Sequence, residues 1–257
     1  MPDLHLRLQD EATGNELIQQ SISEQDALEL LRAAKITTAT LVPWGSNYTF
    51  AVALEAENRH DHMGIYKPKR GERPLWDFPS ATLYLREHAS YLLSKRLGWN
   101  IVPPTVVRHG PHGIGSLQLY VEPAVEREED YEFWGQIRIE IEQLVLFDHI
   151  TNNADRKISH CLVDTDGKIW GIDHGLTFNV DPKLKTVLWQ YVGLPVTPSL
   201  LADLGDLRTN EASVRGELAS NLTVEELDAL FLRIDAILET GMFQELQPDR
   251  NIPYGWW

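Results

Sequence analysis

The chain has 257 residues, of which 43% are hydrophobic, and its formal net charge is −15 at pH 7. This length suffices for one large domain or for two lobes with buried cores. The negative charge argues against nucleic acid as the main partner and against adsorption to anionic membranes, because both need clustered Lys and Arg. A phosphate-bearing ligand would therefore need a local basic pocket or a divalent cation.

The sequence shows no membrane-spanning or secretory signal. No apolar run is long enough to cross a bilayer, and the first residues lack the charged-then-apolar layout of a signal peptide. We therefore expect a cytoplasmic protein with no transmembrane segment and no strong membrane signal. The single cysteine, Cys161, cannot form an internal disulfide and stands in an apolar run, which predicts a buried, unreactive thiol.

The first half of the chain predicts strands and one main helix. Leu4, Leu6 and Leu8 alternate as in a strand, and a helix begins at Ser23 with a capping-box-like start and runs to about Lys35. The next expected elements, in chain order, are a hairpin over 41–54, a strand over 63–68, a helix over 79–97 that Gly98 ends, and strands over 104–107 and 116–121.

The second half is mostly helical. Apolar residues follow helical spacing from about Glu132 to Asp148, and a capping box at Thr223 begins an amphipathic helix that ends near Gly241. Between these helices, residues 161–172 predict a strand, a tight Asp-Gly turn and a second strand. The pattern predicts an α+β fold with a mainly β N-terminal lobe, 1–121, and a mainly α C-terminal lobe, 122–257, around a cleft.

Two aspartates on either side of this hairpin carry the strongest functional signal. Asp155 lies in a polar loop, whereas Asp173 ends an apolar strand, where a carboxylate must find a cation or several donors. The hairpin would bring the two together. Phosphoryl transfer needs one carboxylate to orient the attacking oxygen and another to hold the metal ion that neutralises the phosphates. Taken alone, an aspartate at the position of Asp155 would most often be a turn or cap residue.

Lys67 and Glu87 form a second candidate pair. Lys67 lies within an apolar strand, either as an edge lysine that faces solvent or as a contact for nucleotide phosphates that a helix glutamate positions. Glu87 falls roughly opposite the apolar stripe of its helix, so the pattern alone indicates a solvated charge. It would reach Lys67 only if its helix were packed on both sides.

Two further signals leave alternatives open. The turn at Gly45, Ser46 and Asn47 would offer backbone N–H groups and a hydroxyl to phosphates, or it is an ordinary hairpin turn, since both glycine-rich phosphate-binding patterns are missing. His160 would act in the metal region or as a structural histidine. His-Asp neighbours at 60–62, 148–149 and 173–174 raise a metal-dependent hydrolase as a minority hypothesis, because no His-Glu-x-x-His pair is present.

At these residues the chain resembles the atypical kinase superfamily that contains the phosphatidylinositol 3- and 4-kinases and the HipA-type bacterial toxin kinases. The sequence around Lys67 is similar to the lysine strand of the phosphatidylinositol 4-kinase-like branch, and the sequence from Glu87 to Pro103 to the glutamate helix and turn of the HipA-type kinases. Residues 153–156 resemble the catalytic loop and 172–175 the metal-binding segment. The matches run in the right order from Ser46 to Gly175 and are most similar to bacterial phosphatidylinositol kinase-like proteins.

The resemblance implies ATP, Mg²⁺ or Mn²⁺, and a role for each matched residue. Asp155 would be the catalytic base and Asp173 the metal ligand. The nucleotide-binding residues would be Lys67 on the phosphates, Glu87 orienting it, and Tyr120, Val121 and Glu122 as the adenine-contacting hinge. His160 stands where an asparagine normally ligates a second metal ion. Imidazole is a poor Mg²⁺ ligand, so one ion suffices, Mn²⁺ serves, or nucleotide binds with little turnover.

We therefore expect an ATP-dependent kinase that transfers the γ-phosphoryl group to a hydroxyl of an unidentified protein or small-molecule acceptor. A nucleotide-binding pseudokinase that acts through a partner protein is the alternative, and the metal-dependent hydrolase comes third. The acceptor side is expected at 184–210, where Trp189, Tyr191 and Pro195 equally fit a core.

Overall fold

The structure is a computed structural model that describes residues 22–43, 47–56, 59–124 and 131–253, without the side chains of 59–61 and 131. The strand predicted at Leu4–Leu8, and Ser46, lie outside these residues. The chain divides into two compact units, one formed by residues up to 75 with 104–120 and the other by 76–103 with 121–257. Each unit is described by itself. The expected division into lobes 1–121 and 122–257 stays a prediction, and by compactness 76–103 groups with the second unit.

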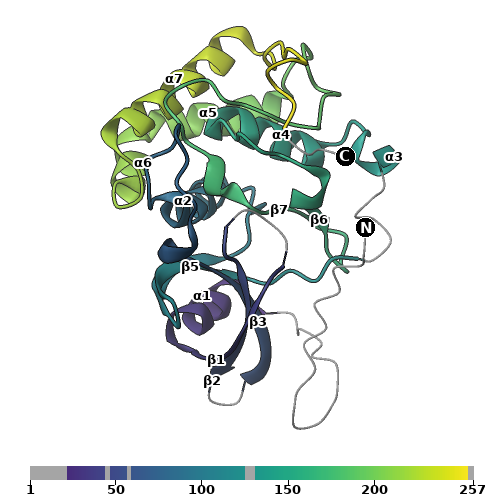
Figure 1. Ribbon diagram of the computed structural model, residues 1–257. Helices are drawn as coiled ribbons and strands as arrows, with labels where there is room; N and C mark the ends of the chain where they lie inside the picture. The colour runs from purple at the N-terminus through teal and green to yellow at the C-terminus, as the bar shows by residue number, and fades with distance from the viewer. Residues whose placement is uncertain (1–21, 44–46, 57–58, 125–130, 254–257) are drawn as a thin grey trace. The chain divides into compact units, whose positions relative to one another are not determined.

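The first unit is an antiparallel sheet covered by one helix (Figure 1). Its strand order is β1-β2-β3-β5-β4, so the hairpin predicted at 41–54 is confirmed as the β1–β2 pair. The elements are α1 (Glu24–Ala33), β1 (Lys35–Leu41), β2 (Phe50–Ala56), β3 (Arg59–Pro68), the short turn η1 (Lys69–Gly71), β4 (Thr105–Gly110) and β5 (Gly113–Leu119).

Helix α1 forms where the capping pattern predicted it. The Ser23 hydroxyl accepts a hydrogen bond from the Asp26 backbone N–H at 3.2 Å, which satisfies one of the donors at the helix start. At the other end, Arg108 Nη1 donates to the carbonyls of Leu31 and Ala34. The helix buries its apolar side against the sheet. The core residues shared by helix and sheet are Ala27, Leu30, Leu31, Ala34, Val52, Leu54, Tyr66, Val106, Leu117 and Leu119.

Strand β3 carries Lys67 beside a required glycine. Lys67 is half-buried and lies opposite Ser116 of β5, while Pro68 lies opposite Gly115. A Cβ atom at Gly115 would stand 2.3 Å from the Lys67 carbonyl oxygen, so only glycine allows the two strands to approach this closely. The strand predicted over 63–68 is confirmed as the end of β3.

The second unit is mainly α, with one small hairpin (Figure 1). Helix α7 packs on α4 and α5, and α2 packs on α6 and on the turn η3. The sequence predicted α2, α4, the hairpin and α7, but not α5 and α6. The elements are α2 (Leu83–Arg96), α3 (Tyr131–Trp134), α4 (Ile139–Thr151), η2 (Ile158–His160), β6 (Cys161–Val163), β7 (Ile169–Gly171), η3 (His174–Leu176), α5 (Pro198–Thr209), α6 (Glu211–Leu218) and α7 (Val224–Thr240).

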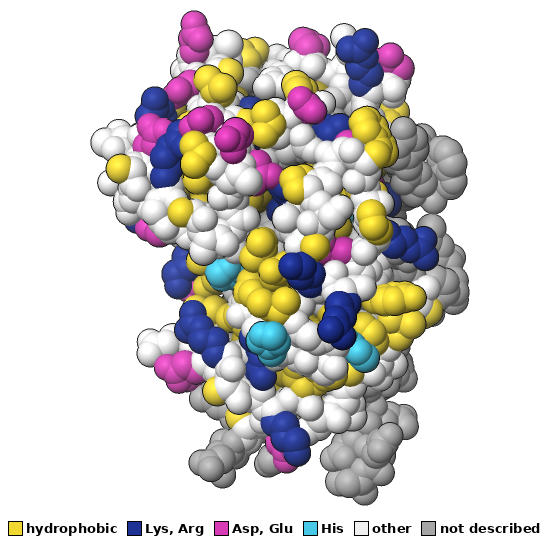
Figure 2. Space-filling view, turned by 60° about the vertical axis from the view of Figure 1, so that its left-hand side comes forward, with side chains coloured by type: hydrophobic (Ala, Val, Ile, Leu, Met, Phe, Trp, Pro, Cys, Tyr) yellow, Lys and Arg dark blue, Asp and Glu magenta, His cyan; other side chains and the backbone are white. Residues whose placement is uncertain are grey.

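Charged side chains of both signs mix on the helical unit. Figure 2 shows basic and acidic groups interspersed over the upper part of one face, at the height of α5 to α7. Arg208 of α5 pairs with Asp235 of α7 at 2.6 Å, and Arg215 of α6 pairs with Asp228 of α7 at 2.8 Å. Within the described residues, no helix has both the length and the apolarity to cross a bilayer.

Candidate functional site

The site begins where α4 ends. Asn152 adopts a left-handed conformation, with φ 55°, which asparagine tolerates better than most residues. Its side-chain amide donates to the carbonyls of Asn179 and Asp181 at 3.0 and 2.7 Å and accepts from the Lys183 N–H at 2.8 Å. The asparagine therefore turns the chain out of the helix and fixes the segment 179–183 to that turn.

A buried ion pair forms the frame of the loop that follows. The Arg156 guanidinium donates through Nε and Nη2 to the two carboxylate oxygens of Asp148, at 2.7 and 2.9 Å. The two side chains are only 0% and 1% exposed, and Asn153 donates a further hydrogen bond to Asp148. Bidentate pairing and extra hydrogen bonds offset the cost of burying both charges. Asp148 is therefore occupied and does not serve as a metal ligand.

The same guanidinium links the two loops of the site. Arg156 Nη1 donates to the carbonyl oxygens of His160 and Ile172, at 2.8 and 3.1 Å. Its Nη2 lies 2.9 Å from Nε2 of His174. Because arginine only donates, Nε2 of His174 must accept, which assigns the ring proton of this buried histidine to Nδ1. The loop after Asp155 and the segment around Asp173 are thus held by one side chain.

Asp155 lies in this loop with a half-buried carboxylate. Its backbone N–H donates to the Asn153 side chain at 3.0 Å, and its Oδ2 lies 3.0 Å from the Lys157 ammonium. Burial raises the pKa of Asp155, and Lys157 partly opposes this rise. A carboxylate with a raised pKa is a stronger proton acceptor than an ordinary surface aspartate.

His160 lies between the backbone of Asp155 and the side chain of Asp173. Its Nδ1 lies 2.9 Å from the Asp155 backbone carbonyl, which only accepts, so Nδ1 carries a proton. Its Nε2 lies 3.3 Å from Oδ2 of Asp173. Burial lowers the pKa of His160, although Asp173 opposes the shift. In the neutral imidazole, the Nε2 lone pair faces a carboxylate oxygen, and these two acceptors need a cation or a proton between them.

Asp173 is both exposed and strained. Its side chain is 48% exposed, whereas that of His160 is 13% exposed. Its backbone is left-handed, with φ 60° and ψ 53°, which costs a non-glycine residue about 1 kcal/mol or more. Backbone strain of this kind concentrates at functional sites, where the surrounding structure holds it in place.

Glu87 helps to hold this strained segment. Its Oε2 accepts a hydrogen bond from the His174 backbone N–H at 3.1 Å, and Glu87 is only 3% exposed. The interpretation of Glu87 as a solvated charge is therefore wrong, because α2 is buried on more than one side. The predicted pairing with Lys67 joins residues of the two units and stays a prediction.

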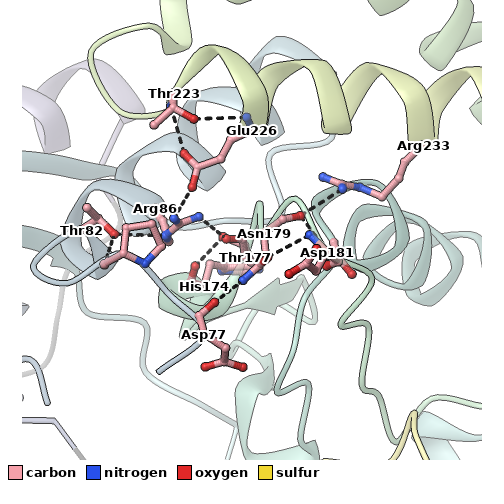
Figure 3. A network of polar contacts seen from close by, with 12 residues as sticks. Asp77, Thr82, Arg86, His174, Thr177, Asn179, Asp181, Thr223, Glu226 and Arg233 are labelled. Carbon is pink, nitrogen blue, oxygen red and sulfur yellow. Dashed lines mark hydrogen bonds and ion pairs between the residues drawn. The ribbon is translucent and has the colours of Figure 1, made fainter. Parts of the chain in front are cut away.

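A polar network anchors the chain after Asp173 to two helices (Figure 3). Arg86 of α2 forms a buried ion pair with Glu226, which also closes the capping box of α7 with Thr223. The other arm of Arg86 donates to the Thr177 carbonyl at 2.6 Å, and the Thr177 hydroxyl donates to the His174 carbonyl at 2.7 Å. The segment that carries the strained aspartate is thus tied to both α2 and α7.

The expected acceptor segment lies beside the loop of Asp155. Residues 185–187 form a parallel bridge with it, in which Arg156 N–H donates to the Lys185 carbonyl at 3.0 Å. On its other side Asn251 accepts from the Thr186 N–H at 2.9 Å and donates to the Leu184 carbonyl at 2.6 Å. The three residues proposed from sequence differ: Tyr191 is buried, Trp189 is half-buried and Pro195 is exposed.

The remaining predicted residues have local structural contacts. Asn47 accepts a hydrogen bond from the Arg73 N–H at 2.8 Å, which ties the β1–β2 loop to the chain after η1. Tyr120 is half-buried and donates through its backbone to Met63 at 3.0 Å. Val121 is half-buried and Glu122 is exposed. Their nucleotide-binding roles stay predictions.

The hydrolase hypothesis gains no support in the part of the chain that the structure describes. No cluster of three or more His, Cys, Asp or Glu side chains there is arranged to hold a metal ion. Asp148 is neutralised by Arg156, and His149 is buried. Cys161 is buried as predicted, and burial raises the pKa of its thiol to about 12.

Sequence reasoning missed two residues of the site. Lys157 follows Asp155 by two positions and pairs with it, and Arg156 connects both loops. The charges in Asp155-Arg156-Lys157 were visible in the sequence, but nothing there showed that the middle one points inward. The partner of Arg156, Asp148, lies on the preceding helix, where the sequence placed it in a helical pattern and among the His-Asp neighbours of the hydrolase hypothesis.

The chain is similar in sequence to a protein of Mycobacterium tuberculosis. No family model matches the chain. Protein Rv2133c of Mycobacterium tuberculosis is 34% identical over 264 aligned positions, which cover 89% of this chain and 95% of that protein.

Solved structures of kinases share the fold. Hydra Fam20 with sugar aligns with a TM-score of 0.58 and 17% identity over 87% of this chain and 90% of that one. The Golgi casein kinase with Mn/ADP bound aligns with a TM-score of 0.55 and 13% identity over 88% of this chain and 80% of that one. The Helicobacter pylori proinflammatory kinase CtkA aligns with a TM-score of 0.50 and 9% identity over 82% of this chain and 94% of that one. The predicted α+β protein-kinase-like fold, mainly β and then mainly α, is therefore confirmed. These similarities concern the fold alone, and membership of the atypical kinase superfamily, with its phosphatidylinositol kinase or HipA-type branch, stays a prediction.

Proposed function

This chain belongs to the family of the Mycobacterium tuberculosis Protein Rv2133c, and we propose that it is an ATP-dependent kinase that transfers the γ-phosphoryl group to a hydroxyl. The kinase-like fold supports the reaction class, and the Golgi casein kinase with Mn/ADP bound supports a nucleotide and a divalent ion as ligands. The proposed acceptor is a protein or a small molecule.

One observation carries the proposal. The imidazole of His160 lies between the backbone carbonyl of Asp155 and the carboxylate of Asp173, and a fully buried arginine holds both loops. The carboxylate of Asp155 is half-buried and has a raised pKa, whereas that of Asp173 is exposed and stands on a strained backbone. Two carboxylates with such different surroundings suit two roles, a proton acceptor and a metal ligand.

The proposed metal ligands are Asp173 and His160, and their chemistry fits a divalent cation. The His160 Nε2 and the Asp173 Oδ2, 3.3 Å apart, would share a divalent cation, and Mn²⁺ accepts the nitrogen ligand more readily than Mg²⁺ does. When bound, such an ion would neutralise charge on the phosphates of the nucleotide. Arg156 and Glu87 hold the backbone from which these ligands project, so little reorganisation is needed at the moment of reaction.

Asp155 is the proposed catalytic base. Its carboxylate would accept the proton of the attacking hydroxyl, and its raised pKa favours that transfer. The ammonium of Lys157, 3.0 Å away, keeps the carboxylate ionised and in place. Because the transition state of phosphoryl transfer asks little covalent chemistry of the protein, positioning by these groups supplies much of the catalysis.

The nucleotide contacts in the proposal rest on the sequence resemblance. Lys67 would bind the α- and β-phosphates and Glu87 would orient it. The β1–β2 loop at Ser46 and Asn47 would approach the phosphates. The hinge would be formed by Tyr120, Val121 and Glu122.

The experiment is a transfer assay with two matched variants. Asp155→Asn removes the proposed base, and Asp166→Asn removes an exposed carboxylate from the turn between β6 and β7. With γ-labelled ATP and Mg²⁺ or Mn²⁺, we expect Asp166→Asn to release or transfer label like the parent. We expect Asp155→Asn to lose at least about 100-fold, the usual range for a general base, while still binding nucleotide. Equal rates for both variants would contradict the proposal.

A pseudokinase is the alternative, and His160 favours it, because an imidazole replaces the usual oxygen ligand at this position. In that case ATP with Mg²⁺ or Mn²⁺ raises the melting temperature, yet no label is transferred or hydrolysed. Asp155→Asn then matches the parent in every assay.

A further inference from the structure

We propose that His160 makes this site selective for first-row transition ions such as Mn²⁺ over Mg²⁺, and that the ion is captured only together with nucleotide phosphates. The inference rests on the proposed function, since it concerns the metal of the same site. It assigns the choice of ion to a single side chain.

The ring of His160 is already oriented as a metal ligand. Its Nδ1–H donates to the Asp155 carbonyl at 2.9 Å, so the tautomer is set and the lone pair is at Nε2. Metal-ligating histidines commonly donate their other ring N–H to a backbone carbonyl or a carboxylate in this way. The His160 carbonyl accepts from the buried Arg156, so the backbone that carries the ring is fixed as well.

The distance between the two ligand atoms suits one small ion. Bonds of about 2.0–2.2 Å at angles of about 90–110° place neighbouring ligand atoms about 2.8–3.6 Å apart. His160 Nε2 and Asp173 Oδ2 are 3.3 Å apart. Both atoms would therefore reach a shared cation with only small side-chain movements.

The ligand types decide which ion is favoured. Mg²⁺ prefers an all-oxygen shell and dehydrates reluctantly, whereas first-row transition ions bind a site that contains nitrogen with an affinity that rises from Mn²⁺ to Co²⁺. An asparagine at this position would offer oxygen instead. Replacing that oxygen by Nε2 should weaken Mg²⁺ binding and spare Mn²⁺.

The site is incomplete without a nucleotide. In the described part of the chain, no third His, Cys, Asp or Glu side chain joins this pair as a possible metal ligand. Asp155, the nearest candidate, pairs through Oδ2 with Lys157. Two protein ligands leave most of the coordination shell to phosphate oxygens and water, so metal and nucleotide should bind cooperatively.

The direct test is electron spin echo spectroscopy of Mn²⁺ bound with ADP to the full chain. A directly bound imidazole couples its nitrogen nucleus to the Mn²⁺ electrons. We expect this modulation in the parent, a change in its frequencies when the protein is made with ¹⁵N-labelled histidine, and its loss in His160→Asn. The isotope arm needs no substitution, so it stands even if the variant folds poorly.

A second measurement gives the selectivity itself. We expect His160→Asn to lower the ratio of the Mg²⁺ to the Mn²⁺ dissociation constant, measured with ADP, by about 10-fold, which corresponds to about 1.4 kcal/mol. Mn²⁺ alone should bind at least about 10-fold more weakly than Mn²⁺ with ADP, within the usual range of coupling between sites.

The outcomes separate the two claims. If Mn²⁺ and ADP bind but histidine labelling leaves the modulation unchanged, a proton rather than a metal ion joins His160 to Asp173. That result overturns this inference and leaves the proposed kinase in place. If Mn²⁺ and ADP fail to bind at all, the inference and the proposed function fail together.

Discussion

Asp148 and Asp155 lie on the two sides of one helix end and have opposite surroundings. Asp148 is 1% exposed, and its carboxylate is fully used by Arg156 and Asn153. Asp155 is half-buried, pairs through Oδ2 with Lys157 at 3.0 Å in a partly exposed ion pair, and has a raised pKa. The first carboxylate stabilises a loop, and the second remains able to react. Residue type therefore tells less about function here than the number of donors around each carboxylate.

The histidines repeat this contrast. His174 is fully buried and accepts from Arg156, whereas His160 turns its Nε2 toward an exposed carboxylate. The structural set of Asp148, Arg156 and His174 thus holds the candidate catalytic set of Asp155, His160 and Asp173. This division predicts that substitutions in the structural set lower the free energy of unfolding, whereas those in the catalytic set weaken the binding or the reaction of ligands.

The largest expected effect is that of Arg156→Met. The substitution leaves the Asp148 carboxylate buried without its cation, which typically costs about 3–5 kcal/mol. The free energy of unfolding from urea titration measures the loss. Arg208→Met is the matched control, because its pairs with Asp235 and Glu211 are partly exposed and should contribute much less. Similar losses for both variants would remove the distinction between buried and exposed pairs.

The next effect depends on pH and concerns His149. Burial lowers the pKa of this histidine from 6.5 to about 4, so the unfolded chain binds more protons between these values. The contribution of His149 is complete above pH 6.5 and is lost as the pH falls toward 4. With about 1.4 kcal/mol for each pKa unit, the loss amounts to about 3 kcal/mol.

His149→Phe is the corresponding test, since a phenyl ring keeps the aromatic contact with Phe243 but does not titrate. Its free energy of unfolding should fall less steeply than that of the parent between pH 6.5 and 4. Parallel pH profiles would show that His149 does not contribute.

A smaller effect is expected at Asn251, which holds the segment 184–186 beside the loop of Asp155. Its side chain donates to the Leu184 carbonyl at 2.6 Å and accepts from the Gln247 N–H at 2.8 Å. Asn251→Ala removes both bonds and should lower the free energy of unfolding by about 1–2 kcal/mol. Chemical unfolding measures it, and hydrogen exchange at the Thr186 amide should accelerate in the same variant. An unchanged exchange rate at the Thr186 amide would show that the Asn251 side chain does not stabilise this segment.

The smallest change in stability should come from Asp155→Asn. Burial disfavours the ionised carboxylate, and its pair with Lys157 is partly exposed, so removing the charge costs little. At pH 7 we expect the free energy of unfolding to stay within about 1 kcal/mol of the parent or to rise. A loss comparable to that of Arg156→Met would assign Asp155 to the structural set.

Much of the fold was predictable because local signals were strong. The capping residues Ser23 and Thr223 marked two helices, and the Asp-Gly turn marked the hairpin that brings His160 next to Asp173. The features that could not be predicted depend on tertiary packing. Helix α2 is buried on several sides, so the position of Glu87 opposite its apolar stripe wrongly indicated a solvated charge. The start of α5, Thr197 followed by Pro198, was overlooked, and α6 was not predicted.

The site was predicted in part for the same reason. Asp155, His160 and Asp173 lie within one short stretch, where sequence spacing constrains geometry. The pairing of Arg156 with Asp148 depends on which way a side chain points after α4 ends, and the left-handed backbone of Asn152 decides that. The hydrophobic periodicity of the sequence does not indicate the direction of such a turn.

The most direct test of the central claim is the melting temperature of Asp173→Asn with Mn²⁺ and ADP. Asparagine tolerates the left-handed backbone, so the variant should melt near the parent without ligand. At about 100 times the dissociation constant, ligand should stabilise the parent by about 2.7 kcal/mol, or about 5–10 °C. We predict this rise for the parent and for Asp166→Asn and its loss in Asp173→Asn. An equal rise in all three proteins would contradict a metal-nucleotide site at Asp173.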